Sequence, residues 1–219
     1  MRRCRKMLAA FLLIWGVSEL VYIADDYREG DAIYTQAGNQ QPELTADPQY
    51  PDIVGWLCID QIGIDYPVVQ GEDNEFYLNH TYDKTENPCG SIMMNCDNQP
   101  SFSDINTILY GHYMKNGTMF GSLKNLAALK EEPAEIIIRT PTGERCYQIL
   151  CIAEVANDNH IFQIKLTGAR FIQYVKDLKT DALYWRELDE DQPEQFLTLV
   201  TCSGGFKLVV IAGYTDLLF

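Results

Sequence analysis

Short runs of β-branched and aromatic residues, separated by turn residues, make up most of the chain after Tyr50. Runs of this length that are bounded by Gly, Pro, Asn and Asp are typical of β-strands. Eight strands are enough to close a barrel or to form a sandwich. The pattern therefore predicts a mainly β domain over residues 50–219, with strands at Ile53–Ile59, Ile64–Gln70, Ser91–Met94, Thr107–Tyr110, Ala134–Thr140, Glu144–Val155, Phe196–Cys202 and Lys207–Tyr214.

Two stretches between these runs change to helical spacing. Asn116–Lys130 and Ala169–Leu178 each carry apolar residues three and four positions apart, which predicts amphipathic helices at the edge of the domain. The second lies inside a forty-residue excursion between strands, Ala156–Gln195. Because long insertions in compact domains are often functional, we expect this one to form the wall of a cleft.

The first 49 residues follow a different pattern. Basic residues crowd positions 1–6, and an apolar segment follows over residues 7–24, interrupted at Ser18 and Glu19. A membrane span needs about 20 apolar residues, and basic residues favour the cytoplasmic side. We therefore expect a single-pass anchor at residues 7–24 with an extracellular body, followed over residues 25–49 by the rest of a helix (Leu20–Ala32) and a polar linker (Thr35–Pro51). A cleaved signal peptide and a buried amphipathic helix are the alternatives.

The charge of the chain excludes one class of partner. The 219 residues include 17 basic and 31 acidic side chains, so the formal net charge is −14. A body this acidic repels phosphate backbones, and the sequence has no basic face to reverse the repulsion. Nucleic-acid binding is therefore not expected.

The seven cysteines do not form a metal or disulfide pattern. Their number is odd, there is no CxxC motif, and no histidine lies at ligand spacing from a cysteine. We therefore expect no metal and no cofactor. Cysteines in apolar runs, such as Cys58, usually serve as small core residues. A disulfide between Cys89 and Cys96 remains an open alternative.

Two strand ends carry reactive side chains. His112 follows the strand at Thr107–Tyr110 after one glycine, and Cys202 ends the strand that begins at Phe196 and is followed by Ser-Gly-Gly. An accessible cysteine with a histidine elsewhere in the fold is a candidate nucleophile. A serine hydrolase is not supported, because the chain has no GxSxG elbow. The two other histidines, His80 and His160, lie in polar stretches typical of surface loops.

Five blocks, in this order along the chain, resemble a class B sortase: Tyr50–Trp56, Ile64–Gly71, Tyr77–His80, Asn106–His112 with Met119–Gly121, and Leu197–Cys202. The resemblance implies an eight-stranded sortase-type β-barrel with peripheral helices, held at a Gram-positive cell surface by an N-terminal anchor. It also implies a cysteine transpeptidase. Its partners would be surface proteins with a C-terminal sorting signal and an amine acceptor from the cell-wall precursor or a pilin.

The same resemblance assigns roles to individual residues. Cys202 would attack the sorting signal and form a thioacyl enzyme, while His112 would protonate the leaving amine and deprotonate the incoming one. The groove for the sorting signal would be lined by Asn74, Leu78, Tyr110 and Thr201.

One position departs from the family pattern. Class B sortases carry an arginine at the start of the strand after the cysteine, whereas this chain has Lys207 there and no arginine after Arg186. If Gly204-Gly205 forms a two-residue hairpin loop, Cys202 lies opposite Lys207 on the same face. A three-residue loop would instead pair Cys202 with Phe206. An impaired module that binds sorting signals without joining them is the alternative function. A papain-like hydrolase is disfavoured because Cys202 ends a strand rather than opening a helix.

Overall fold

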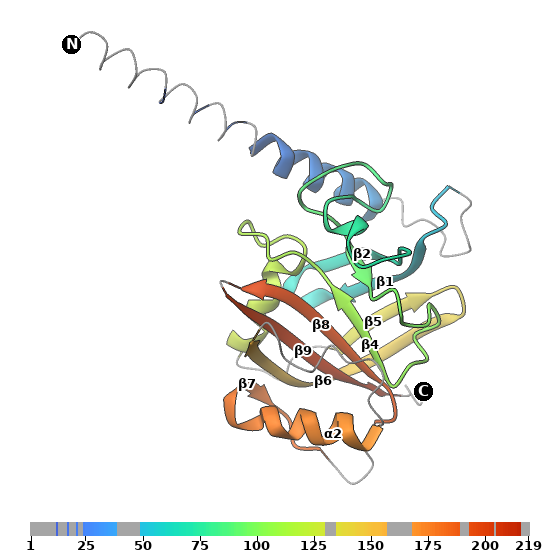
Figure 1. Ribbon diagram of the computed structural model, residues 1–219, viewed down its shortest axis with the longest axis vertical. Helices are drawn as coiled ribbons and strands as arrows, with labels where there is room; N and C mark the ends of the chain where they lie inside the picture. The colour runs from blue at the N-terminus through green and yellow to red at the C-terminus, as the bar shows by residue number, and fades with distance from the viewer. Residues whose placement is uncertain are drawn as a thin grey trace, which may run out of the picture.

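The computed structural model describes residues 12, 17, 21, 24–38, 49–129, 135–156, 168–188, 193–203 and 205–215. Its core is a single sheet of nine strands (Figure 1). The strands are β1 (Ile53–Ile59), β2 (Ile64–Val69), β3 (Ile92–Met94), β4 (Asn106–Tyr110), β5 (Glu135–Thr140), β6 (Gly143–Ala156), β7 (Ala182–Trp185), β8 (Phe196–Ser203) and β9 (Phe206–Thr215).

Eight of the nine strands close into a barrel. They follow the order β5-β1-β2-β3-β4-β8-β9-β6, and a further pairing between β5 and β6 joins the two ends. The pairs β2–β3 and β4–β8 are parallel, and the others in the barrel are antiparallel. The eight-stranded barrel predicted from the alternating runs is therefore confirmed, with strand boundaries within one residue of those expected.

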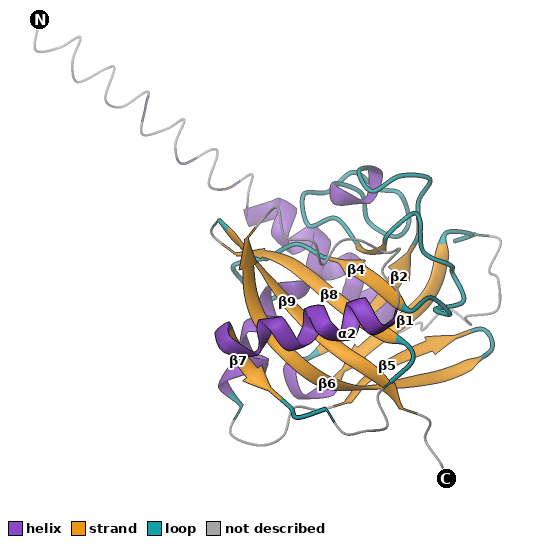
Figure 2. Ribbon diagram, turned by 60° about the horizontal axis from the view of Figure 1, so that its bottom comes forward, coloured by secondary structure: helices purple, strands orange, loops and turns teal. Residues whose placement is uncertain are grey.

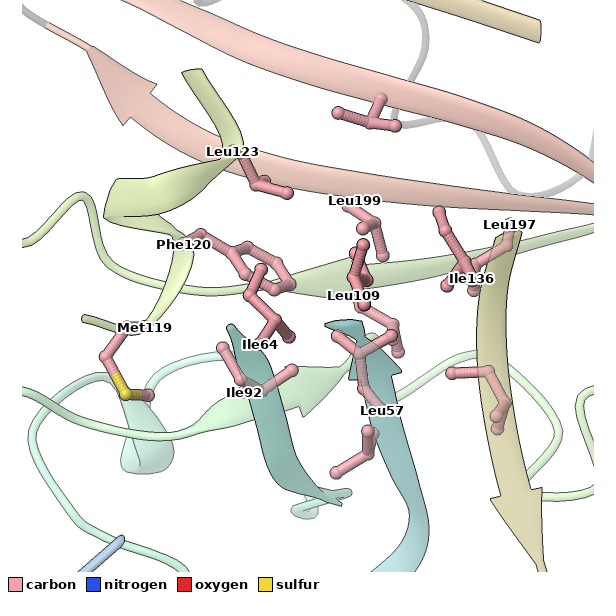
Figure 3. Close-up of a cluster of buried hydrophobic side chains, with 14 of the residues drawn as sticks. Leu57, Ile64, Ile92, Leu109, Met119, Phe120, Leu123, Ile136, Leu197 and Leu199 are labelled. Atoms are coloured by element: carbon pink, nitrogen blue, oxygen red, sulfur yellow. The ribbon is translucent and has the colours of Figure 1, made fainter. Parts of the chain in front are cut away.

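Every second side chain along these strands points into the barrel, as the two-residue period of a strand requires. Leu57, Leu109, Leu197 and Leu199, from three different strands, are fully buried there. Figure 3 shows these leucines meeting between the strands. The interior is therefore a packed apolar core and not a channel.

A second apolar layer covers part of the outside of the barrel. Helix α2 (Gly168–Asp177) lies across β6, β8 and β9 (Figure 2) and buries Phe171 and Val175 against them. The helix predicted at Ala169–Leu178 is thus confirmed. The short 3₁₀ helix η5 (Leu178–Asp181) leads from it into β7, which pairs with β6 beside the barrel. We did not predict β7, because four residues are too few to show an alternating pattern.

The other predicted helix differs from expectation. Within Asn116–Lys130 the described chain forms η3 (Phe120–Ala128), a 3₁₀ helix and not an α-helix. Phe120, Leu123 and Leu126 are buried at a spacing of three residues. This spacing puts them on one face of a helix with three residues per turn, which explains why the 3₁₀ form is adopted.

The N-terminal helix extends further than expected. Residues 24–38 are helical, so the segment beginning at Thr35 is helix and not linker as far as residue 38. Tyr34 and Ala37 are 6% and 2% exposed and belong to the main apolar core. The helix therefore packs on the barrel. Most of the expected anchor, residues 7–24, lies outside the described residues, and no helix among the described residues is long and apolar enough to cross a membrane.

Candidate active site

The ends of β4 and β8 bring the two candidate catalytic residues to one edge of the barrel. These strands are parallel, with Tyr110 opposite Val200, and the Gly111 amide continues the pairing by donating to the Val200 carbonyl oxygen at 3.1 Å. Continuing this register two residues further places position 112 beside position 202. The backbone positions of His112 and Cys202, which are far apart in sequence, therefore lie at the same edge of the barrel, because parallel strands end at the same edge.

The hairpin between β8 and β9 fixes the position of Lys207. Ser203 pairs with Phe206 and Cys202 pairs with Lys207. The loop thus has two residues, and Gly205 has a φ of +106°, a value that favours glycine. The predicted pairing of Cys202 with Lys207 is confirmed, and the pairing with Phe206 is excluded. The Cys202 side chain lies outside the described part of the structure, so its position is known from this backbone register.

The backbone around His112 is held from three sides. The Phe120 amide at the start of η3 donates to the His112 carbonyl oxygen at 3.1 Å. At Gly111 a Cβ atom would lie 2.6 Å from a methyl carbon of Ile92 and 2.7 Å from the Phe120 ring, so no larger residue fits there without displacing its neighbours. The histidine ring in turn bonds through Nε2 to the Leu78 carbonyl oxygen at 2.5 Å.

This hydrogen bond determines which nitrogen of the neutral imidazole carries the hydrogen. A carbonyl oxygen only accepts hydrogen bonds, so Nε2 of His112 carries the hydrogen. Nδ1 is therefore the nitrogen that can exchange a proton with a bound molecule. The acceptor, Leu78, belongs to the short 3₁₀ helix η2 (Phe76–Leu78), which forms the wall of the site facing β8.

A cavity of about 240 Å³ lies where these elements meet. Every predicted site residue whose side chain is described lines it, together with residues that we did not predict. The lining consists of Asn74, Leu78, Ser91, Met93, Tyr110, Gly111, His112, Val200, Thr201 and Lys207.

The charge of the cavity differs from that of the whole chain. Its described lining includes a histidine and a lysine but no carboxylate, although the net charge of the protein is −14. Positive groups close to a thiol favour its thiolate form, which is the nucleophilic form. Burial raises the pKa of Tyr110, whose hydroxyl accepts a hydrogen bond from Asn95 Nδ2 at 3.1 Å, so this side chain stays neutral.

Comparison with known proteins agrees with this geometry. Residues 57–213 match the sortase domain family. The chain belongs to the sortase family. The chain is 32% identical over 159 residues to sortase B of Listeria monocytogenes, a match that covers 69% of the chain and 63% of that protein. It therefore spans less than two thirds of that relative's length.

Solved structures show the same barrel. Sortase B of Clostridium perfringens superposes with a TM-score of 0.69 at 27% identity, covering 77% of this chain and 97% of the other. A Bacillus anthracis protein similar to sortase B gives a TM-score of 0.72 at 26% identity, covering 86% and 97%. The sortase-type barrel predicted from the five sequence blocks is thus confirmed.

Class B sortases carry an arginine at the start of the strand after the cysteine, where this chain has Lys207. No other arginine takes its place among the described residues that line the cavity. Arg139 pairs with Glu144 at 3.1 Å, and the Arg186 backbone pairs with Leu150 in the middle of β6. Arg145 bonds to the Tyr147 hydroxyl at 3.0 Å at the far end of the barrel. Arg170 lies on α2, which covers the outer layer. Among the described lining residues, Lys207 is the cation beside the Cys202 position.

The buried cysteines in the described part of this sortase behave as core residues. Cys58, Cys89 and Cys151 are buried, and burial raises the pKa of each thiol to about 12. Cys89 and Cys96 are both free, so the disulfide left open by the sequence is not formed.

Of the other two histidines, His80 does not line the cavity. His80 stacks on Phe76 with the ring centroids 4.0 Å apart, outside the cavity. His160 lies outside the described residues. Ser91, just before β3, and Met93, within it, were missed as lining residues, because β3 runs parallel to β2 and nothing in the local sequence indicates which edge it borders.

Proposed function

We propose that this protein is a class B sortase, a cysteine transpeptidase that cleaves a C-terminal sorting signal and transfers the acyl part to an amine. One observation carries the proposal. His112, Lys207 and the backbone position of Cys202 converge at one cavity at the end of β8. The family membership and the similarity to sortase B proteins support it.

The first half of the reaction forms a thioester. The Cys202 thiolate attacks the carbonyl carbon of the scissile peptide bond, and the carbonyl oxygen becomes an oxyanion. His112 in its protonated form gives the Nδ1 proton to the leaving amine as the C–N bond breaks. The neutral imidazole that remains keeps its hydrogen on Nε2, which is the tautomer that the bond to the Leu78 carbonyl oxygen favours.

The second half reverses these steps with a new amine. The incoming nitrogen attacks the thioester carbon, His112 takes the amine proton on Nδ1, and the C–S bond breaks to release the thiolate. Water competes with the amine, so a shielded site favours transfer over hydrolysis.

Lys207 is proposed to stabilise the oxyanion. Paired residues on neighbouring strands have Cβ atoms about 4.5–5.5 Å apart, so the lysine is close to the carbonyl that Cys202 attacks. A lysine supplies one compact charge where arginine supplies a planar donor with two prongs. The loss of one such donor typically slows an enzyme by about 10²–10³-fold.

Four side chains are proposed to bind the sorting signal: Asn74, Leu78, Tyr110 and Thr201. All four lie on the cavity surface. Thr201 is 2% exposed, and its hydroxyl has no hydrogen-bond partner among the described residues. A buried hydroxyl without a partner is costly, and a peptide group of the substrate would satisfy it.

The cellular setting is also part of the proposal. The basic residues at positions 1–6 and the apolar segment at 7–24 support a single-pass anchor in the cell membrane, with residues 50–219 as the extracellular catalytic domain. The acceptor would be an amine of the cell-wall precursor or of a pilin.

The test is to trap the intermediate. The full chain is incubated with a panel of sorting peptides, with and without a small amine, and analysed by intact-protein mass spectrometry. We expect an acyl adduct on Cys202 that disappears when the amine is added and is absent from Cys202→Ala. Peptide binding without any adduct would support the impaired binding module instead.

A further inference from the structure

The N-terminal helix contacts the turn that precedes β3. Figure 1 shows the helix, in blue, beside the green loops above the barrel. The Asn87 side chain donates from Nδ2 to the Asp26 carbonyl oxygen at 3.2 Å, and Tyr34 enters the main core nearby. The helix is therefore attached to the segment of residues 79–91.

The Tyr34 hydroxyl makes the deepest of these contacts. It donates to the Gly90 carbonyl oxygen at 2.6 Å and lies 3.2 Å from Ser91 Oγ. The ring packs edge-on against Tyr66, with the centroids 5.3 Å apart. The hydrogen bond to Gly90 is buried, so the hydroxyl fixes the Gly90–Ser91 turn and not only the helix.

This turn is in direct contact with η2 and with the residues that follow it. The Ser91 amide donates to the Tyr77 carbonyl oxygen at 2.9 Å, and Ser91 Oγ donates to the His80 carbonyl oxygen at 2.8 Å. At Gly90, where φ is +56°, a Cβ atom would lie 2.5 Å from the Leu78 carbonyl oxygen. The turn and the Leu78 carbonyl group are therefore in close contact.

The Leu78 carbonyl oxygen is the acceptor that holds Nε2 of His112. A continuous set of contacts thus runs from the Tyr34 hydroxyl through the Gly90–Ser91 turn and the Leu78 carbonyl to the histidine ring. Ser91 also lines the cavity, so a shift of this turn changes the site at two points.

We propose that Tyr34 is a positioning residue for His112, through which the N-terminal helix sets the orientation of the imidazole in the active-site cavity. The inference rests on the proposed function for its effect on catalysis, but the orientation itself is independent of activity. If the Tyr34 hydroxyl is lost, the buried Gly90 carbonyl keeps only the weak donor Cys89 Sγ at 3.6 Å, and the turn relaxes against Leu78. A displacement of about 1 Å in a catalytic group can cost about 10²-fold in rate.

The test compares two tyrosines of the same helix. Tyr34→Phe removes the hydroxyl and keeps the ring, while Tyr27→Phe makes the same change at a ring that packs on the same core. Melting curves check that both variants are folded. Imidazole ¹⁵N chemical shifts of His112, assigned with His80→Gln and His160→Gln variants, report which nitrogen carries the hydrogen in the neutral ring.

We expect Tyr34→Phe to reduce the Nε2–H form of His112 and to lower kcat for thioacyl formation by about 10–100-fold, with little change in KM. Tyr27→Phe should leave both measurements as in the wild type. An unchanged His112 spectrum in a folded Tyr34→Phe variant would overturn the inference. A wild-type protein that forms no thioester would refute the proposed function, and the ¹⁵N measurement would still decide the role of Tyr34.

Discussion

The two ends of the β6–β9 ladder carry cations in different surroundings. At the far end, Arg145 bonds to the Tyr147 hydroxyl and to the Gln195 side chain, and its guanidinium lies 4.4 Å from the Tyr214 ring centroid. At the near end, Lys207 lies opposite Cys202 and lines a cavity of about 240 Å³. The comparison shows that one pair of strands holds a cation tied into packing at one end and a cation facing a binding site at the other.

The largest effect is expected from replacing the proposed nucleophile, Cys202, at the near end. Cys202→Ala is expected to lower thioacyl formation by about 10⁴-fold or more, because it removes the nucleophile that forms the thioester. The melting temperature should change little. Peptide conversion measured by chromatography and a melting curve check both points. Cys96→Ala is the matched control, because this thiol is free and lies outside the cavity lining. If Cys202→Ala turned over peptide as fast as the wild type, the proposed sortase mechanism would be ruled out.

The next largest effect is expected at His112. His112→Ala should reduce kcat/KM by about 10²–10⁴-fold, the usual contribution of a general acid and base. His80→Ala removes an imidazole that stacks on Phe76 outside the cavity and should retain most of the activity. Steady-state kinetics with one sorting peptide compare the two. A larger loss at His80 than at His112 would show that the histidine has been assigned wrongly.

The third-largest loss of activity is expected at Lys207. Lys207→Ala is expected to cost about 10²–10³-fold in turnover, as for the loss of an oxyanion donor. Lys207→Arg should keep or raise activity, because it restores the donor that class B sortases carry. Single-turnover rates of thioacyl formation measure the step at which the oxyanion forms. If Lys207→Ala turns over as fast as the wild type, the lysine has no catalytic role.

The smallest catalytic effect is expected at the far end. Arg145→Met removes the hydrogen bonds to Tyr147 and Gln195 and the contact with the Tyr214 ring. We expect the free energy of unfolding to fall by about 1–2 kcal/mol, with kcat/KM within about twofold of the wild type. Urea denaturation and the same peptide assay measure the two quantities. A loss of activity larger than that of Lys207→Ala would remove the distinction between the two ends.

The parts of the fold that local sequence determines were predicted. Alternating runs indicated all eight barrel strands, and Gly204-Gly205 indicated the two-residue loop that pairs Cys202 with Lys207. The elements that were missed depend on distant contacts. Strand β7 is four residues long and exists through its pairing with β6, and η3 adopts the 3₁₀ form because its buried residues repeat every third position.

The active site likewise combines features that the local sequence predicted with contacts between distant residues that it did not. His112 and Cys202 were recognisable as strand ends, and their placement at one edge of the barrel follows from the parallel pairing of β4 and β8. The bond from His112 to the Leu78 carbonyl could not be predicted, because any residue supplies a carbonyl oxygen. The contact of Tyr34 with Gly90 joins residues 56 positions apart, and the sequence suggested a linker close by.

The two-residue loop between β8 and β9 also limits how the site can move. With so short a connection, Cys202 and Lys207 belong to one hairpin and keep a fixed backbone register, so one position cannot shift along the strands without the other. Adjustment to peptides of different shape must then come from the opposite wall, where η2 carries Leu78 on a segment joined by loops. Insertion of a single residue into the hairpin would turn Lys207 to the other face of the sheet. Variation in specificity is therefore expected in the η2 wall, while the length of the hairpin stays constant.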